Sequence, residues 1–113
     1  MHIYFSGIGG VGLGPLAEIA LDAGYDVSGS DANDSSMFRQ LQARGAEVHL
    51  GQEVAIINQL HANQPIDWLV YTAALPESHP ELEFARSNGI KTSKRDELLA
   101  NIISDKNLKL IAI

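Results

Sequence analysis

A glycine-rich turn near the amino terminus has the spacing of a phosphate-binding motif. Gly7, Gly9 and Gly12 form the pattern G-x-G-x-x-G after a short apolar run, and residues 13–23 follow with helical periodicity. A strand, a glycine turn and a helix start in this order gather unpaired backbone N–H groups and the positive end of the helix dipole, which attract phosphate. We therefore expect a nucleotide diphosphate to bind here. The alternative is a glycine turn that only packs the helix against the strand.

Each of the three glycines has a separate task in such a turn. Gly7 allows the chain to turn tightly, Gly9 lets the backbone approach a pyrophosphate, and Gly12 lets the helix pack closely against the strand. Glycine-rich turns are common, so the position after a strand and before a helix is what favours a ligand.

Two polar side chains end the next predicted strand, residues 25–30. Asp31 follows the glycine motif by about 20 residues, where dinucleotide-binding folds have an acid that accepts hydrogen bonds from ribose hydroxyls. Ser30 adds a hydroxyl beside it. We expect both residues to contact a ribose or its base. The alternative is that Asp31 begins the following turn and caps the next helix.

Small residues follow the fourth predicted strand, on the same edge of the sheet as the glycine turn. Thr72, Ala73 and Ala74 would let a nucleoside or a phosphate lie against the backbone, or they form an ordinary connection kept small by packing. Arg95, near the start of the last predicted helix, either meets a phosphate or pairs with the acidic residues that follow it.

Composition excludes several classes of function. The formal net charge is -6, which argues against nucleic-acid and anionic-membrane partners, because both favour a basic surface. There is no cysteine, and the four histidines do not have metal-ligand spacing, so we predict no metal site and no catalytic residue. No apolar run approaches the roughly 20 residues that span a bilayer. We expect a cytoplasmic protein.

Strands and helices are predicted to alternate through all 113 residues, which we take as one domain. This order favours parallel strands with right-handed crossovers, and thus an α/β fold: an open, doubly wound, mostly parallel sheet with helices on both faces. A last apolar strand, residues 108–113, ends without a loop, so we expect a fragment cut before a functional loop. The predicted strands are 2–6, 25–30, 46–50, 66–71, 90–92 and 108–113. The predicted helices are 13–23, 54–63, 81–88, one that Ser93 caps, and one that Asn33, Asp34 or Ser35 caps and Gly45 closes.

The sequence resembles the amino-terminal domain of the Mur ligases. The similarity is carried by G-I-G-G-V-G at residues 7–12, G-Y-D-V-S-G-S-D at 24–31, Y-T-A-A at 71–74, P-E at 80–81 and K-R-D-E-L-L at 94–99. It is strongest to the members that add L-alanine or a recycled peptide. One departure is His79, which precedes Pro80 where the family usually has asparagine.

The resemblance implies a site for the UDP part of UDP-N-acetylmuramic acid or of its peptide-bearing form. The turn that holds the diphosphate would be Gly7, Ile8, Gly9, Gly10, Val11 and Gly12. Ser30 and Asp31 would contact the uridine, residues 72–74 would line the other side, and Arg95 matches a basic position of the family.

The resemblance also implies a reaction that this chain does not complete alone. In the family, a central domain binds ATP with Mg²⁺ and begins with a phosphate loop after a strand like residues 108–113. The intact enzyme phosphorylates the muramyl carboxylate, and an amine then attacks the acyl phosphate. We expect the central and carboxyl-terminal domains to be partners of this domain, and the chain by itself to have no ligase activity.

Two other classes of protein fit the residues. Gly7, Gly9, Gly12 and Asp31 also suit a NAD-binding domain, either of a dehydrogenase or of a regulatory sensor. The third possibility is a non-catalytic interaction domain whose glycine turn binds no ligand.

Overall fold

The computed structural model describes residues 2–8, 13–31, 34–51, 54–71 and 78–94. These residues form five strands and four helices that alternate along the chain. The elements are β1 (His2–Ser6), α1 (Leu13–Asp22), β2 (Asp26–Asp31), α2 (Ser36–Ala43), β3 (Glu47–Leu50), α3 (Val54–Asn63), β4 (Trp68–Tyr71), α4 (Pro80–Ser87) and β5 (Lys91–Lys94).

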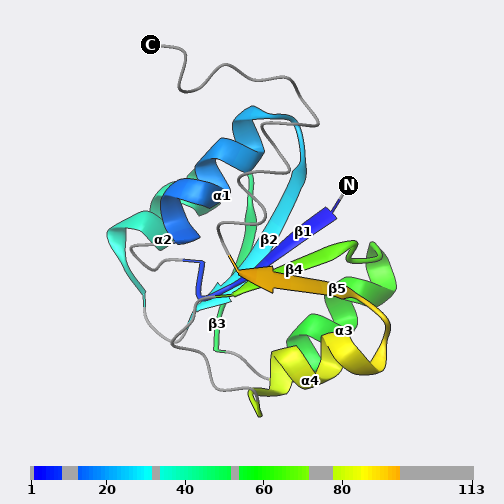
Figure 1. Ribbon diagram of the computed structural model, residues 1–113. Helices are drawn as coiled ribbons and strands as arrows, with labels where there is room; N and C mark the ends of the chain where they lie inside the picture. The colour runs from blue at the N-terminus through cyan, green and yellow to red at the C-terminus, as the bar shows by residue number, and fades with distance from the viewer. Residues whose placement is uncertain (1, 9–12, 32–33, 52–53, 72–77, 95–113) are drawn as a thin grey trace.

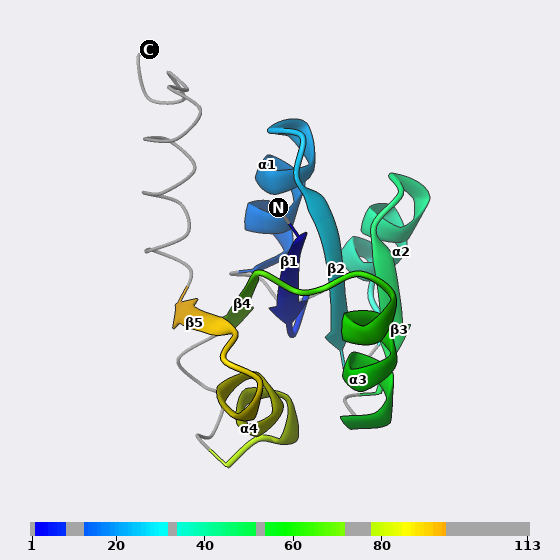
Figure 2. The same cartoon turned by 90° about the vertical axis from the view of Figure 1, so that its right-hand side faces the viewer.

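All five strands belong to one parallel sheet with the order β3-β2-β1-β4-β5. The chain moves outward from β1 through β2 to β3, then crosses the sheet and continues from β4 to β5. Figure 1 shows α1 and α2 on one face of the sheet and α3 and α4 on the other, and Figure 2 gives the view turned by 90°. The predicted doubly wound α/β fold is confirmed.

Strand β1 is buried along its whole length and supplies both halves of the core. Ile3 and Phe5 pack in the cluster that α1 and α2 cover, whereas Tyr4 lies in the cluster that α3 and α4 cover. This follows from the period of two in a strand, which points successive side chains to opposite faces. A central parallel strand therefore needs apolar residues on both faces, as the sequence of β1 has.

The strand order indicates where along the carboxyl edge of the sheet a ligand is expected to bind. Strands β1 and β4 are neighbours in the sheet, but the helices that follow them, α1 and α4, cover opposite faces. In open parallel sheets, ligands bind in the crevice at such a switch point. The glycine turn after β1 therefore lies at the expected place.

The predicted end of β5 and the role of Ser93 were wrong. The strand continues through Lys94, and Ser93 is a buried strand residue instead of a helix cap. Its hydroxyl oxygen accepts a hydrogen bond from Nε1 of Trp68 on the neighbouring strand, at 2.6 Å. The strand predicted at residues 108–113 lies outside the described residues. In the described part of the chain, no helix has the length and apolar character to cross a membrane.

Candidate functional site

The ends of the strands define one edge of the sheet. Ser6, the last residue of β1, pairs with Ser30 of β2 and with Tyr71 of β4, while Asp31 pairs with Leu50 of β3. The predicted contact residues Ser30 and Asp31 thus lie beside the start of the glycine turn. The register confirms that these two strand ends meet.

Gly7 begins the turn in a backbone conformation that favours glycine. Its φ is 91°, in the left-handed region, so the predicted tight turn at this position is confirmed. The N–H groups of Gly7 and Ile8 both donate to the carbonyl oxygen of Ser30, at 2.8 and 2.9 Å. The expectation that the turn's N–H groups are unpaired is therefore wrong for these two residues.

Ile8 is fully buried and packs against Gly29. A Cβ atom on Gly29 would lie 2.8 Å from Cβ of Ile8 and 2.6 Å from the carbonyl oxygen of Phe5. Glycine is thus required in β2 for steric reasons, although its φ is ordinary. This role of Gly29 could not be predicted, because a missing side chain reveals nothing about the neighbour that occupies its space.

Ser30 is fully buried, and its hydroxyl points to a carboxylate of the protein. It donates to Oε1 and Oε2 of Glu81, at 2.8 Å in each case. Asp31 is half-buried at the end of β2, and its carbonyl oxygen accepts from the N–H of Gly51 at 2.8 Å. Contact of Ser30 and Asp31 with a uridine stays a prediction.

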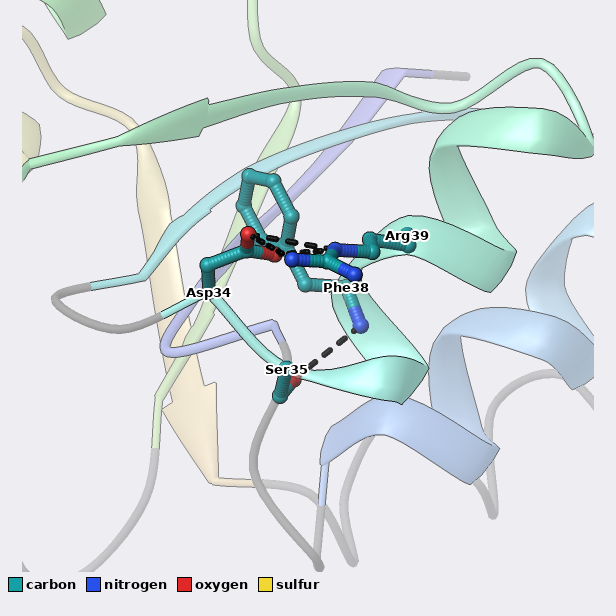
Figure 3. A network of polar contacts seen from close by, with 4 residues as sticks. All are labelled: Asp34, Ser35, Phe38 and Arg39. Atoms are coloured by element: carbon teal, nitrogen blue, oxygen red, sulfur yellow. Dashed lines mark hydrogen bonds and ion pairs between the residues drawn. The ribbon is translucent and has the colours of Figure 1, made fainter.

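Helix α2 begins without the help of Asp31. Ser35 is the residue that caps it, accepting from the N–H of Phe38 at 3.1 Å. Beside it, Arg39 forms an ion pair with Asp34 and donates three hydrogen bonds to its carboxylate, at 2.7, 3.0 and 3.1 Å (Figure 3). A hydrogen bond from Arg39 lowers the pKa of the exposed Asp34 carboxyl. The alternative role of Asp31 as a helix cap is therefore wrong.

Glu81, which the sequence analysis did not single out, is the carboxylate at the centre of the described site. It lies in the first turn of α4, is fully buried, and accepts hydrogen bonds from three hydroxyls: Tyr4, Ser6 at 2.6 Å, and Ser30. Burial, and then the negative charge of Glu81, raise the pKa of the Tyr4 phenol far above its ordinary value. The sequence does contain a signal for such a residue. Tyr4 and Ser6 place hydroxyls at alternate positions of the buried strand β1, and buried hydroxyls need a hydrogen-bond partner.

His79 caps the same helix. Its Nδ1 atom accepts from the N–H of Glu81 at 3.2 Å, so the residue that departs from the family pattern performs the task of a helix N-cap. An asparagine side chain is suited to the same task. The departure from the family pattern is thus explained by helix capping, because either side chain can cap α4 at this position.

Several predicted site residues lie outside the described residues. These are Gly9, Gly10, Val11, Gly12, Thr72, Ala73, Ala74 and Arg95. Their contacts with a ligand stay predictions. Among the described residues, no group of three or more histidine, aspartate and glutamate side chains is arranged to hold a metal ion.

A groove of about 420 Å³ lies between α2 and β3. Asp34, Arg39 and Leu50 are among its lining residues, and Leu50 pairs with Asp31 across the strands. The groove therefore borders the strand end that carries the predicted ribose contact.

The strand order and the glycine turn define a Rossmann-like domain. A family model described as "Mur ligase family, catalytic domain" matches residues 2–107. The chain belongs to the Mur ligase family.

Curated relatives carry the name UDP-N-acetylmuramate–L-alanine ligase. The protein from Clostridium acetobutylicum is 46% identical over 101 residues, which are 89% of this chain and 21% of that protein. The one from Frankia alni is 41% identical over 111 residues, covering 98% of this chain and 19% of that protein. The chain thus spans about a fifth of the length of these relatives.

Solved structures of similar fold have related titles. A UDP-N-acetylmuramate:L-alanyl-gamma-D-glutamyl-meso-diaminopimelate ligase from Neisseria meningitides is 31% identical, with a TM-score of 0.77 over 88% of this chain and 30% of that one. A UDP-N-acetylmuramate-alanine ligase from Thermotoga maritima has a TM-score of 0.78 at 24% identity, covering 93% of this chain and 23% of that one. The second likeness shows the shared fold.

Proposed function

We propose that this chain is the UDP-binding domain of an ATP-dependent, amide-forming ligase of peptidoglycan synthesis. Its ligand would be the UDP part of UDP-N-acetylmuramic acid or of the peptide-bearing form. The observation that carries the proposal is membership of the Mur ligase family over residues 2–107, with curated relatives named for UDP-N-acetylmuramate. This membership disfavours the alternative of a NAD-binding dehydrogenase or sensor.

The geometry of the carboxyl edge supports a nucleotide ligand. Gly7 turns the chain at the end of β1 with a left-handed backbone conformation, and Asp31 lies at the tip of the neighbouring strand. A diphosphate near the helix start and a ribose near the carboxylate would use the edge as other doubly wound folds do. Residues 9–12 and 72–74 and Arg95 would complete the contacts.

The intact ligase would require ATP and Mg²⁺, bound by a central domain. When bound, they supply phosphorylation of the muramyl carboxylate, and the amine of L-alanine or of a recycled peptide then forms the amide. The part of this chain is to hold the UDP group and so orient the muramyl carboxylate toward the central domain. We propose the central and carboxyl-terminal domains as its partners, and the cytoplasm as its location.

The test is a titration of the isotopically labelled 113-residue chain, followed by NMR. UDP and UDP-N-acetylmuramic acid should shift the amide signals of Gly7, Ile8, Ser30 and Asp31, whereas NAD at equal concentration should leave them in place. Shifts with NAD alone would contradict the proposal in favour of a nicotinamide site. The absence of shifts with all three compounds would favour a domain without a nucleotide ligand.

A further inference from the structure

Glu81 connects elements that are far apart in the sequence. Its Oε1 atom accepts from the hydroxyls of Ser6 and Ser30, and its Oε2 atom accepts from Ser30 and from the phenol of Tyr4. Tyr4 and Ser6 belong to β1, Ser30 belongs to β2, and Glu81 begins α4. One buried carboxylate therefore joins three elements beneath the carboxyl edge.

Ser30 links this carboxylate to the glycine turn. While its hydroxyl donates to Glu81, its carbonyl oxygen accepts from the N–H groups of Gly7 and Ile8. A shift of Ser30 would therefore move the first two residues of the turn. Because the backbone of Ser6 is continuous with Gly7, the Ser6 hydroxyl provides a second link between Glu81 and the same turn.

Glu81 also lies next to the loop that leaves β4. Nδ1 of His79 accepts from the backbone N–H of Glu81, so the residue that carries the carboxylate is held at the base of this loop by the helix cap. Strands β1 and β4 are neighbours at the switch point of the sheet. Glu81 thus contacts the end of β1 through Ser6, and its helix begins directly after the loop that leaves β4.

A buried carboxylate is a costly means of attaching a helix. Leu82 and Ala85 of α4 are already fully buried in the core, and apolar residues of similar volume often stabilise a fold as well as buried ionic groups do. The hydrogen bonds of Glu81 are directional, whereas apolar contacts are not. The carboxylate therefore gives a defined position to the hydroxyls that donate hydrogen bonds to it.

We propose that Glu81 is a positioning residue for the UDP site, acting through Ser6 and Ser30 on the turn at Gly7 and Ile8. The proposal rests on the proposed function of the chain as a UDP-binding domain. Glu81 is fully buried and acts without touching the ligand. Its carboxylate holds the hydroxyls of Ser6 and Ser30 in place, and so fixes the start of the glycine turn for a nucleotide diphosphate.

The experiment compares Glu81→Gln with two controls on the same helix. Glutamine has the shape of glutamate, but its amide nitrogen donates where the hydroxyls require an acceptor. Glu83→Gln makes the same chemical change at an exposed position, and Leu82→Ala destabilises the buried face without removing a hydrogen bond. UDP affinity is measured by calorimetry on the 113-residue chain, well below the unfolding temperature of each variant.

We expect Glu81→Gln to weaken UDP binding at least about fivefold, which corresponds to about 1 kcal/mol at 25 °C. Glu83→Gln and Leu82→Ala should bind UDP like the unchanged chain. The amide protons of Gly7 and Ile8 should also exchange faster in Glu81→Gln, relative to that of Phe5 in the same variant. If Glu81→Gln does not fold, Ser6→Ala is tested in its place, and it should also weaken UDP binding.

The outcomes separate this inference from the function on which it rests. Failure of the unchanged chain to bind UDP would overturn both. UDP binding that is equal in the unchanged chain and in Glu81→Gln would overturn the role of Glu81 alone. An equal loss in Leu82→Ala would show that general destabilisation weakens binding, and would also overturn it.

Discussion

Gly29 and Ile8 are packed so closely that a side chain on the first would overlap the second. A Cβ atom built on Gly29 would lie 2.8 Å from both Cβ and Cδ1 of Ile8. Ile8 follows Gly7 in the turn after β1, and it is fully buried. The packing of β2 against Ile8 thus helps to fix the start of the turn.

We expect Gly29→Ala to lower the free energy of unfolding by about 1–3 kcal/mol, as overpacking of a core does. The new methyl group would also meet the carbonyl oxygen of Phe5, which is backbone and moves less easily than a side chain. Urea unfolding measures the change. Gly14→Ala is the comparison, because its Cβ would chiefly meet the flexible Met37, and a loss there as large as at Gly29 would contradict this explanation.

Stability at alkaline pH should depend on Tyr4. Burial and the charge of Glu81 raise the pKa of its phenol above the ordinary value of 10.0, so the unfolded chain loses this proton at lower pH than the folded chain does. Folding stability should therefore fall as the pH rises above about 10, by up to about 1.4 kcal/mol per pH unit. Urea unfolding at several pH values measures how the free energy of unfolding changes with pH. This slope should be shallower in Tyr4→Phe. Equal slopes in the two proteins would contradict the assignment of the effect to Tyr4.

The ion pair at the start of α2 should be visible in the titration of Asp34. The hydrogen bond from Arg39 lowers the pKa of this carboxyl below 3.8, and Arg39→Gln should raise it toward that value. The ion pair stabilises the fold at pH values above 3.8. This contribution to the free energy of unfolding is lost as the pH falls through the lowered pKa of Asp34. NMR of the carboxyl carbon measures the titration. An unchanged pKa in Arg39→Gln would show that the pair does not persist in solution.

The hydrogen bond between Trp68 and Ser93 should contribute to the stability of the β4–β5 edge. Ser93→Ala leaves the buried indole N–H without this acceptor, which is expected to lower the free energy of unfolding by about 1–3 kcal/mol. In a Trp68→Phe background the same change should have little effect, because the donor is absent. Equal losses in both backgrounds, measured by urea unfolding, would contradict the pairing.

Much of the fold was predictable because its elements follow local rules. Alternating strands and helices, glycines at helix ends and the short apolar β1 predicted a doubly wound sheet that the structure confirms. The end of β5 was predicted wrongly, because Ser93 has the local pattern of a helix cap and only its pairing partner shows that it belongs to the strand. At Ser93, pairing with β4 therefore outweighs the local preference for a helix cap.

The candidate site was less predictable than the fold. The motif led to Gly7 and Asp31, but it did not show that the N–H groups of Gly7 and Ile8 are used by Ser30. Glu81 was noted only as the start of a helix and as part of the P-E pair that carries the family resemblance. Its partners Ser6 and Ser30 are 75 and 51 residues away along the chain, and no periodicity relates residues at such separations.

The sequence by itself determined the fold class, the family resemblance and the edge of the sheet where a ligand is expected. These depend on patterns that repeat every two or 3.6 residues and on glycines within one turn, so neighbours in the chain are sufficient. Only the tertiary structure decided that Ile8 fills the space above Gly29 and that Glu81 joins β1, β2 and α4. Strand register and the crossover from β3 to β4 bring those atoms together, and hydrogen bonds require positions accurate to a few tenths of an ångström.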